Sequence, residues 1–307
     1  MAPRTIDFHT HAHPTSEAGI AFQRLWRLEQ PERDGTPGEL LSIMDRAGIA
    51  RTLVLPWMPA QDHYDRRVAQ LAEGGQRPSA QQLSEAKRQV IESWRGLNQW
   101  AVDAVAAHQG RLLCLVGLDP LFMGEELVQE ETTDKLAQGA CGLKIAPMFL
   151  RVTPDDPRMA VVFELARDHG VFVLSQAGAH GYDGNPGWGH PRHFEPVLKA
   201  YPEVNIVLAH LGLGAEEDVA RLTAAYPNLY ADTSMRLHLL GQPGQWSVEE
   251  AVHWFRRIGI DRVIFGTNYP LCDPVRFTQV MDALALTEAE CRAVLFENAE
   301  GLLEQTR

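Results

Sequence analysis

The residues whose types and spacing could do chemistry come first in the chain, where His9 and His11 flank a single threonine. They end a short run that begins at Thr5, alternates apolar and polar residues, and is stopped by Pro14. Side chains two positions apart on a strand point to the same face, so both imidazoles should project from one strand end. Two converging neutral imidazoles are the first requirement of a zinc-like site. The spacing therefore indicates metal ligation, with surface histidines beside a turn as the alternative reading.

Short apolar runs recur along the chain, and helical patterns such as Pro37–Ala47 and Val248–Ile258 alternate with them. Near-continuous apolar strands are typical of a parallel sheet covered by helices on both faces. The runs are Thr5–His9, Thr52–Pro56, Leu112–Leu118, Cys141–Ala146, Val171–Gln176, Val204–His210, Asn228–Thr233 and Arg262–Thr267. We therefore predict one α/β domain over residues 1–307, a (β/α)8 TIM barrel with an additional C-terminal helix over Thr287–Gln305.

Two insertions interrupt the regular alternation of strands and helices. Residues 57–80 are polar and read as a loop, and residues 177–192 are rich in glycine and aromatic side chains. Each follows a predicted strand, and barrel active sites form at the end where the strands finish. We expect both insertions to lie over the active face.

Composition excludes several classes of partner. The net charge of -12 and the pI near 5.4 argue against nucleic acid or an anionic membrane surface as the main partner. No apolar run is long enough to span a membrane. Scattered cysteines without a C-x-x-C spacing and the lack of a secretion signal predict a cytoplasmic protein. We expect a small-molecule substrate, and a homodimer is possible although no interface stripe is evident.

Polar residues collect where the predicted strands end, as a catalytic barrel requires. They are Lys144, Gln176, His210, Asp232 and Asn268. Each has a simpler structural reading: the lysine could extend to solvent, and the two amides could cap loops. For Asp232 we favour capping of the following segment over a catalytic role. Together, however, the strand ends predict an active site.

The order and spacing of these motifs resemble the amidohydrolase superfamily, and more closely its branch of metal-dependent hydrolases and of aminocarboxymuconate-semialdehyde and hydroxybenzoate-type decarboxylases. The segments that carry the resemblance are Asp7–Pro14, Gly142–Pro147, Val171–Gly178, Tyr201–Gly212, Phe265–Pro270 and Glu297–Leu303. The resemblance implies one divalent metal, with zinc expected first and manganese or iron as alternatives. By position it makes His9 and His11 ligands and His210 a ligand or acid/base group, and it matches Lys144 to a fourth-strand lysine.

Two positions depart from the family pattern. Gln176 stands where the family has a metal-binding histidine, and Asn268 stands where it has an aspartate that binds metal and takes a proton from water. Asparagine offers only a neutral oxygen and cannot act as a base near pH 7. His9, His11 and His210 could still form a three-histidine set with an open position for water. A fold-back of His180 as a replacement ligand, or loss of the metal, are the alternatives.

Three functions follow from these residues. The first is metal-dependent hydrolysis of a C–N or C–O bond in a small carboxylated or cyclic substrate, with Lys144, Gln176, His210 and Asn268 around the reacting group. The second is non-oxidative decarboxylation, or a related lyase reaction, of an aromatic or enol acid. It needs no base at position 268, and Trp57, Phe149, Tyr182 and Trp188 could wall an aromatic ring. The third is a metal-free or degenerate barrel with a binding or acid/base role.

Overall fold

Parallel strands form the centre of the fold, which a computed structural model describes for residues 5–26, 31–73, 75, 77–180 and 187–306. Within these residues the strands form two hydrogen-bonded groups. The first contains β1 (Thr5–Thr10), β2 (Ile49–Val54) and β3 (Leu112–Cys114), and the second contains β4 (Val116–Gly117), β5 (Gly142–Ile145), β6 (Phe172–Ser175), β7 (Ile206–Leu208), β8 (Leu229–Asp232) and β9 (Val263–Ile264). Every pairing between neighbours is parallel.

Backbone hydrogen bonds join the two groups at both seams. Leu115 alone separates β3 from β4, and its N–H donates to the carbonyl of Val54 over 3.1 Å. At the other seam the N–H of Phe8 donates to Phe265 over 2.9 Å, and the N–H of Asn268 donates to His9 over 2.8 Å. The predicted (β/α)8 barrel is therefore confirmed.

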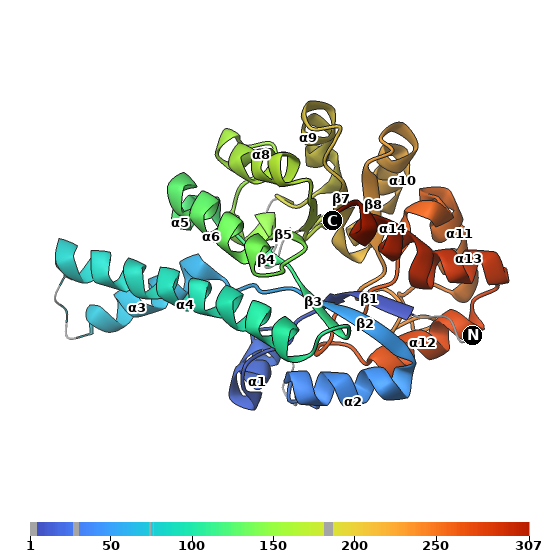
Figure 1. Ribbon diagram of the computed structural model, residues 1–307, viewed down its shortest axis with the longest axis horizontal. Coiled ribbons are helices and arrows are strands. Elements are labelled where there is room, and N and C mark those ends of the chain that lie inside the picture. Colours follow the sequence, from blue (N-terminus) through green and yellow to red (C-terminus); the bar gives the residue numbers. More distant parts are fainter. Residues whose placement is uncertain (1–4, 27–30, 74, 76, 181–186, 307) are drawn as a thin grey trace.

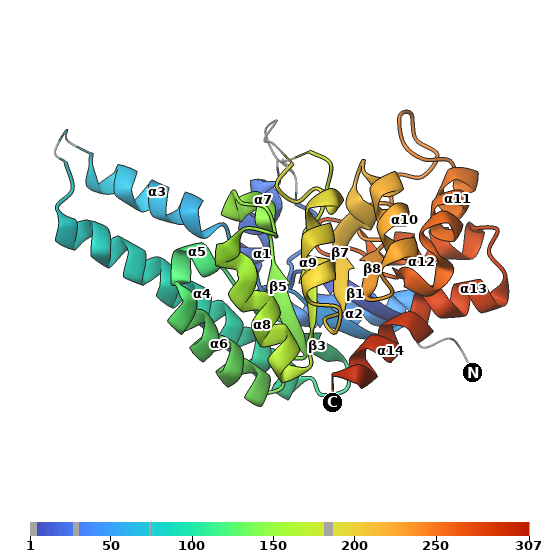
Figure 2. The same cartoon turned by 90° about the horizontal axis from the view of Figure 1, so that it is seen from above.

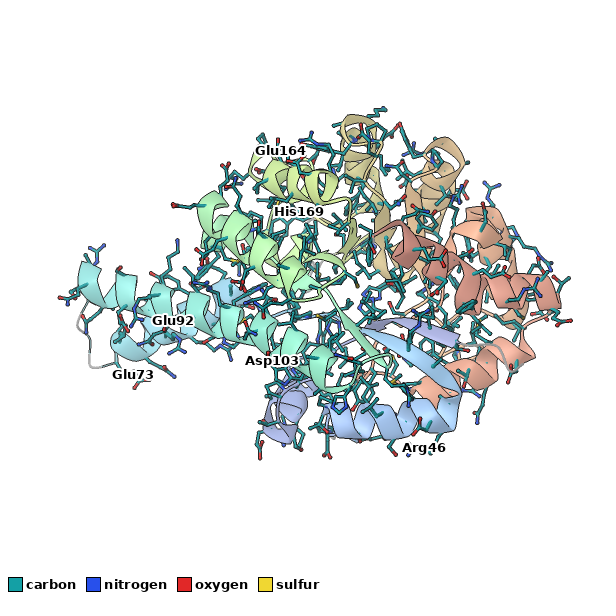
Figure 3. All side chains as sticks on the ribbon, in the orientation of Figure 1. Arg46, Glu73, Glu92, Asp103, Glu164 and His169 are labelled. Carbon is teal, nitrogen blue, oxygen red and sulfur yellow. The ribbon has the colours of Figure 1, made fainter. Side chains whose placement is uncertain are left out.

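Helices surround the strands on the outside of the barrel (Figures 1 and 2). They are α1 (Ser16–Leu25), α2 (Pro37–Ala47), α3 (Ala60–Leu71), α4 (Ala80–Ala107), α5 (Pro120–Met123), α6 (Glu125–Ala137), α7 (Pro147–Leu150), α8 (Ala160–His169), α9 (Glu195–Ala200), α10 (Glu216–Ala225), α11 (Val248–Ile258), α12 (Pro274–Ala283), α13 (Glu288–Arg292) and α14 (Asn298–Gln305). Their outward faces carry charged side chains such as Arg46, Glu92, Asp103 and Glu164 (Figure 3).

The C-terminal helix begins where the sequence predicts it. The side chain of Thr287 caps α13 by accepting from the N–H of Glu290, and the Glu290 carboxylate accepts from the N–H of Thr287. This reciprocal pair is a capping box. A π-helical turn over Ala293–Glu297 joins α13 to α14. Leu302 and Leu303 of α14 then pack into an apolar cluster with strand residues, so this helix contributes to the core.

The prediction of a loop over residues 57–80 is wrong for most of that segment. It contains α3, which has no side-chain cap at its start and packs along α4. The two helices form an arm that extends away from the barrel (Figures 1 and 2). Of the second insertion, 177–192, residues 181–186 lie outside the described part of the chain, and a 3-10 turn begins at Pro191.

Candidate active site

The two histidines of the first strand converge as their spacing predicts. The Nε2 atoms of His9 and His11 lie 3.3 Å apart, and both side chains are buried. Burial lowers the pKa of His9, although Asp232 opposes the shift. Burial also lowers the pKa of His11, well below its ordinary value. Both imidazoles are therefore neutral near pH 7, which is the form that binds a metal.

Hydrogen bonds fix which ring nitrogen of each first-strand histidine carries the proton. His11 Nδ1 lies 3.0 Å from the carbonyl oxygen of Leu55, which can only accept, so Nδ1 donates. His9 Nδ1 lies 2.8 Å from Oδ2 of Asp232 and donates to that carboxylate. When Nδ1 donates to a partner, the lone pair of Nε2 stays free to bind a metal. Many metal-bound histidines donate their other ring N–H to a carboxylate or a carbonyl in this way.

His210 follows β7 and is oriented in the same way. Its Nδ1 lies 2.7 Å from the hydroxyl oxygen of Ser234, and that hydroxyl in turn donates to Asp232. The hydroxyl therefore accepts from His210 Nδ1, and Nε2 of His210 keeps its lone pair. Burial lowers the pKa of His210 to about 3, with a smaller contribution from His9. The backbone of His210 is left-handed, with φ 63°.

Asp232 is the hub of this network, which the sequence did not predict. Besides His9, it accepts hydrogen bonds from the backbone N–H groups of His210 and Ser234, at 3.1 Å and 3.0 Å. The bond from Ser234 is the cap that the sequence predicts. The contacts of Asp232 with His9 and His210 were not predicted. Burial raises the pKa of Asp232, yet attraction to His9 and His210 and the side-chain hydrogen bonds from His9 and Ser234 outweigh burial and hold the pKa well below its ordinary value. The signal available was an acidic residue two before a serine at a strand end.

Gln176 and Asn268 occupy the two positions that depart from the family pattern. Gln176 follows β6 and Asn268 follows β9, and both line the same cavity as His9 and His11. Gln176 Oε1 and Asn268 Oδ1 are buried, and neither has a hydrogen-bond donor among the described residues. Buried polar atoms are normally paired, so the two amide oxygens require a partner that is a cation or a donor.

A buried carboxyl beneath the site positions the Asn268 turn. Asp7 accepts from the N–H of His9 at 3.1 Å and from the N–H and hydroxyl of Thr267 at 3.0 Å and 2.6 Å. Burial raises the pKa of Asp7 to about 7, although the bonds from Thr267 oppose this. Asn268 itself adopts φ 74°, so Asp7 ties β1 to a strained turn that carries a site residue.

Lys144 is the cation of the cavity. It lies within β5, is 3% exposed, and lines the same space as the histidines. Burial lowers its pKa to about 7, while Asp232 opposes the shift. The predicted site residues are therefore brought together, with the exception of His180, which is exposed.

Aromatic side chains form part of the cavity lining. Trp57 and Phe149 line it as predicted, with ring centroids 4.3 Å apart, and Phe22 and Trp26 from the α1 region join them without having been predicted. Tyr182 lies outside the described residues. The cavity is narrow, about 30 Å3, which is room for one or two water molecules.

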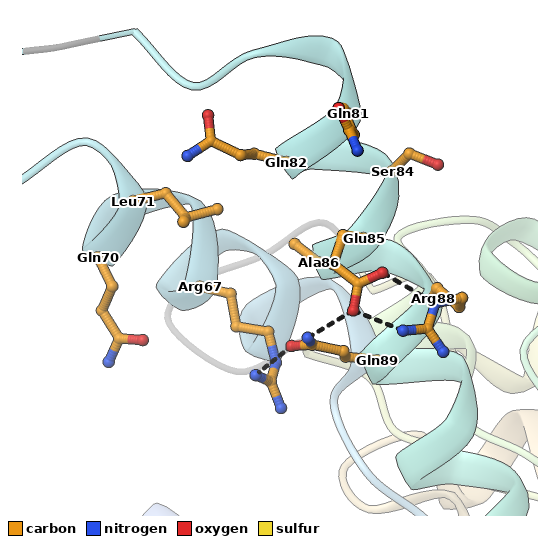
Figure 4. Close-up of a pocket in the computed structure, with 10 residues that line it drawn as sticks. All are labelled: Arg67, Gln70, Leu71, Gln81, Gln82, Ser84, Glu85, Ala86, Arg88 and Gln89. Atoms are coloured by element: carbon orange, nitrogen blue, oxygen red, sulfur yellow. Dashed lines mark hydrogen bonds and ion pairs between the residues drawn. The ribbon is translucent and has the colours of Figure 1, made fainter.

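A larger cavity of about 710 Å3 lies between α3 and α4 (Figure 4). Several of its polar side chains bond to one another: Gln89 contacts Arg67 and Glu85, and Glu85 also binds Arg88. Glu85 and Arg88 form an ion pair, Arg67 donates to the amide of Gln89, and none of the described residues that line the cavity is a histidine. The narrow cavity at the strand ends is the better candidate, because buried groups with shifted pKa values converge there.

The residues around the narrow cavity fit a divalent cation. His9 and His11 offer nitrogen lone pairs, and Gln176 and Asn268 offer amide oxygens that lack a partner. The predicted set of His9, His11 and His210 does not form the tightest cluster. Among the described residues, the potential ligand atoms that lie within 4.8 Å of one another belong to His9, His210 and Asp232. Since Asp232 already accepts from His9 Nδ1, we regard it as an orienting group behind the histidines.

Comparison with known families gives one match over nearly the whole chain. The family model described as Amidohydrolase matches residues 6–304. A sequence search of curated proteins finds no match. None of the described helices has the length and apolar character needed to cross a membrane.

Solved structures of similar fold cover the chain from end to end. An uncharacterised TIM-barrel protein from Bordetella bronchiseptica has a TM-score of 0.72 at 17% identity, covering 98% of this chain and 99% of its own. A dihydroxybenzoic acid decarboxylase from Polaromonas sp., with manganese and 2-nitroresorcinol bound, has a TM-score of 0.68 at 17% identity, with 99% and 97% covered. A probable 2-pyrone-4,6-dicarboxylic acid hydrolase from Acinetobacter baumannii, with citric acid bound, has a TM-score of 0.62 at 15% identity, with 98% and 99% covered. At these identities the likeness shows the fold alone.

Proposed function

Because the chain belongs to the amidohydrolase family, we propose that it is a metal-dependent enzyme acting on a small carboxylated substrate. The family and the structural relatives include both hydrolases and decarboxylases. Of the two reactions, we propose non-oxidative decarboxylation of an aromatic or enol acid, which the sequence placed second to hydrolysis.

The observation that carries this choice is Asn268. An attacking water needs a base, and the amide at this position cannot take a proton near pH 7. Decarboxylation instead needs a site for the carboxylate and an acid that delivers a proton to carbon. Lys144 is buried in the cavity with a pKa of about 7, which matches a group that must hold and release a proton at neutral pH.

The residues divide the work as follows. His9 and His11, with the amide oxygens of Gln176 and Asn268, would hold a divalent metal, which when bound supplies positive charge next to the substrate oxygens. Lys144 faces the carboxylate and transfers its proton to the carbon that bears it. The C–H bond forms, the bond to the carboxyl carbon breaks, its electron pair returns to the ring or enol, and carbon dioxide leaves. Lys144 then regains a proton from solvent.

The aromatic side chains that line the cavity suit a flat substrate. Phe22, Trp57 and Phe149 present ring faces and edges around the cavity, and aromatic pairs favour offset or edge-to-face contacts with a bound ring. Because the cavity is narrow, these side chains must move apart to admit an aromatic acid. The manganese in the Polaromonas protein makes manganese a candidate beside zinc and iron.

Hydrolysis of a C–N or C–O bond is the second candidate, and His210 favours it. Ser234 and Asp232 hold Nδ1 of His210, so its Nε2 can accept a proton from water. The low pKa of His210, about 3, makes it a weak base, and this is why we place hydrolysis second.

The test begins with protein purified without chelators, whose zinc, manganese and iron are measured by inductively coupled plasma mass spectrometry. Hydroxybenzoates and enol acids with a 13C-labelled carboxyl group are then assayed for labelled carbon dioxide. Lactones and esters are assayed for acid release in a pH-stat, and amides are assayed for ammonia release. His9→Ala should abolish both metal content and turnover, while His253→Ala, at an exposed histidine on α11, should change neither. Acid or ammonia release without labelled carbon dioxide would reject decarboxylation. A metal-free protein without turnover would support the degenerate barrel.

A further inference from the structure

The arm formed by α3 and α4 carries positive charge in an acidic protein. From Arg66 to Arg88 the sequence contains five arginine and lysine residues and two glutamates, a net charge of +3, whereas the whole chain carries -12. Arg88 pairs with Glu85 and Glu92, but the other four cations have no carboxylate partner among the described residues. They are Arg66, Arg67, Arg77 and Lys87. The distal part of the arm is therefore a basic surface.

An exposed apolar side chain accompanies these cations. Leu71, the last residue of α3, is 37% exposed and lines the cavity between the two helices (Figure 4). Helix α3 packs mainly along α4, and of its residues only Ala60 is buried. Most helical stability in proteins comes from tertiary packing of an apolar face. A partner that covers Leu71 and meets the cations would therefore stabilise the arm.

A groove with a volume of about 550 Å3 lies between α5 and α8, at the foot of the arm. Phe122 of α5 fixes this position, because its ring centroid lies 5.9 Å from that of Tyr64 on α3 and 5.4 Å from Nζ of Lys87 on α4. The ribbon likewise shows α5 beside the base of the arm (Figures 1 and 2). We call this site the α5–α8 groove.

The α5–α8 groove offers the charge that would complement the arm. Three charged side chains line it, and one of them, Arg158, donates to Asp156 from Nε at 2.9 Å and from Nη2 at 2.8 Å. The other two, Glu125 and Glu164, are exposed and have no ion-pair partner in the described part of the chain. The remaining lining is apolar and consists of Pro120, Leu121, Pro157, Ala160 and Val161. Free carboxylates beside an apolar surface complement an exposed leucine beside unpaired cations.

We propose that the arm of one copy of this chain docks into the α5–α8 groove of a second copy, whose own arm docks into the groove of the first. A twofold axis creates both contacts at once, because every pairing across such an interface occurs twice. The groove lies at the foot of the arm, so two arms that run antiparallel bring each tip to the groove of the other copy. The occupant is a second copy because this chain supplies both the basic arm and the acidic groove.

The size of the arm is sufficient for a stable dimer. The 12 residues of α3 span about 18 Å, and two packed helices are about 20 Å wide, so one face of the arm covers on the order of 400 Å2. Each protomer buries this face and also the groove that receives the other arm, which gives about 800 Å2 per partner. This is the standard area of a specific protein interface.

Analytical ultracentrifugation of the whole protein should detect a dimer between about 1 and 100 µM. High salt should weaken this dimer, because exposed charge pairs are screened. The arm variant combines Arg66→Glu with Arg77→Glu, and the groove variant combines Glu125→Lys with Glu164→Lys. Within each variant the arm and the groove carry like charges, so the dissociation constant should rise at least about tenfold.

A mixture of the two variants separates docking from a loss of folding. The acidic arm of the first variant meets the basic groove of the second, and the unchanged basic arm meets the unchanged acidic groove. A mixed dimer should therefore form with about the affinity of the wild type, which misfolded proteins could not do. The matched control combines Arg46→Glu with Arg276→Glu, at exposed arginines on α2 and α12, and should dimerise as the wild type does.

Three outcomes would overturn the proposal. A wild type that stays monomeric to about 100 µM has no such interface; if this monomer bound phosphatidylserine vesicles through Arg66 and Arg77, the arm would serve an anionic membrane instead. A dimer that neither variant weakens uses another face. Weakened variants that fail to associate in the mixture, although each keeps the circular dichroism spectrum and melting temperature of the wild type, would show that the arm does not dock into this groove.

Discussion

Replacing Lys144 by methionine should change how the stability of the protein depends on pH. Lys144 is 3% exposed, and burial lowers its pKa from 10.5 to about 7. The interval between these two values, at about 1.4 kcal/mol per pH unit, corresponds to about 5 kcal/mol, an upper bound for the cost of burying the charged form.

The sign follows from proton binding. Below pH 7 the ammonium is charged in both states, and the native state bears the whole cost of burial. Between pH 7 and 10.5 the unfolded state binds more protons than the native state, so the free energy of unfolding rises with pH through this interval. Lys144→Met removes the titrating group and keeps an unbranched apolar chain of similar length. The variant should therefore be more stable than the wild type at pH 6, and the difference should shrink towards pH 10.

The assay is urea unfolding of the metal-free proteins, followed by tryptophan fluorescence at one-unit steps from pH 6 to pH 10. The difference between wild type and variant isolates Lys144 from other groups that titrate in this range. Lys199→Met, at an exposed lysine on α9, serves as the control and should not reproduce the slope. A constant difference between wild type and Lys144→Met across the range would refute the reasoning, because it would mean that Lys144 keeps an ordinary pKa.

Three further predictions concern the site, the core and a helix. Asp232→Asn should reverse the proton on the ring of His9 and weaken metal binding by about 10 to 100-fold, measured by calorimetry with Mn2+ or Zn2+; unchanged affinity would show that the carboxylate does not orient the ring. Gly117→Ala should lower the unfolding temperature, because the added carbon would lie 2.3 Å from the carbonyl oxygen of Pro56 and overpacking costs about 1 to 3 kcal/mol. Gly96→Ala on α4 has nothing within 4 Å and should stabilise the helix by up to about 1 kcal/mol; equal melting temperatures of the two variants would contradict this.

The elements of the barrel were readable because their signals are local. Apolar runs mark the strands, and helices such as Val248–Ile258 are predicted by a serine at the N-cap and a glycine at the C-terminal end. Helix α3 was missed because its sequence is polar and its start has no side-chain cap. Its helical form depends on packing along α4, which is a tertiary effect that local propensity does not contain.

The sequence predicted the residue types of the site but not the hydrogen bonds between them. His9, His11, Lys144 and His210 stand at strand ends in the sequence, and the fold brings them to one cavity. The partners of their ring nitrogens come from other strands, as when Leu55 accepts from His11 across 44 positions of sequence. No single-sequence pattern links such residues, because the contact exists only once the strands are in register.

The left-handed backbone of the two residues after Ala209, which follows β7, predicts how this protein would change under laboratory selection. His210 and Leu211 both adopt positive φ, 63° and 50°, and such conformations cost a non-glycine residue of order 1 kcal/mol or more. A library selected only for heat tolerance should therefore drift towards glycine or asparagine at these two positions. A library selected for turnover should keep the histidine. Comparing the two selections would reveal which positions of the chain are maintained at the expense of stability.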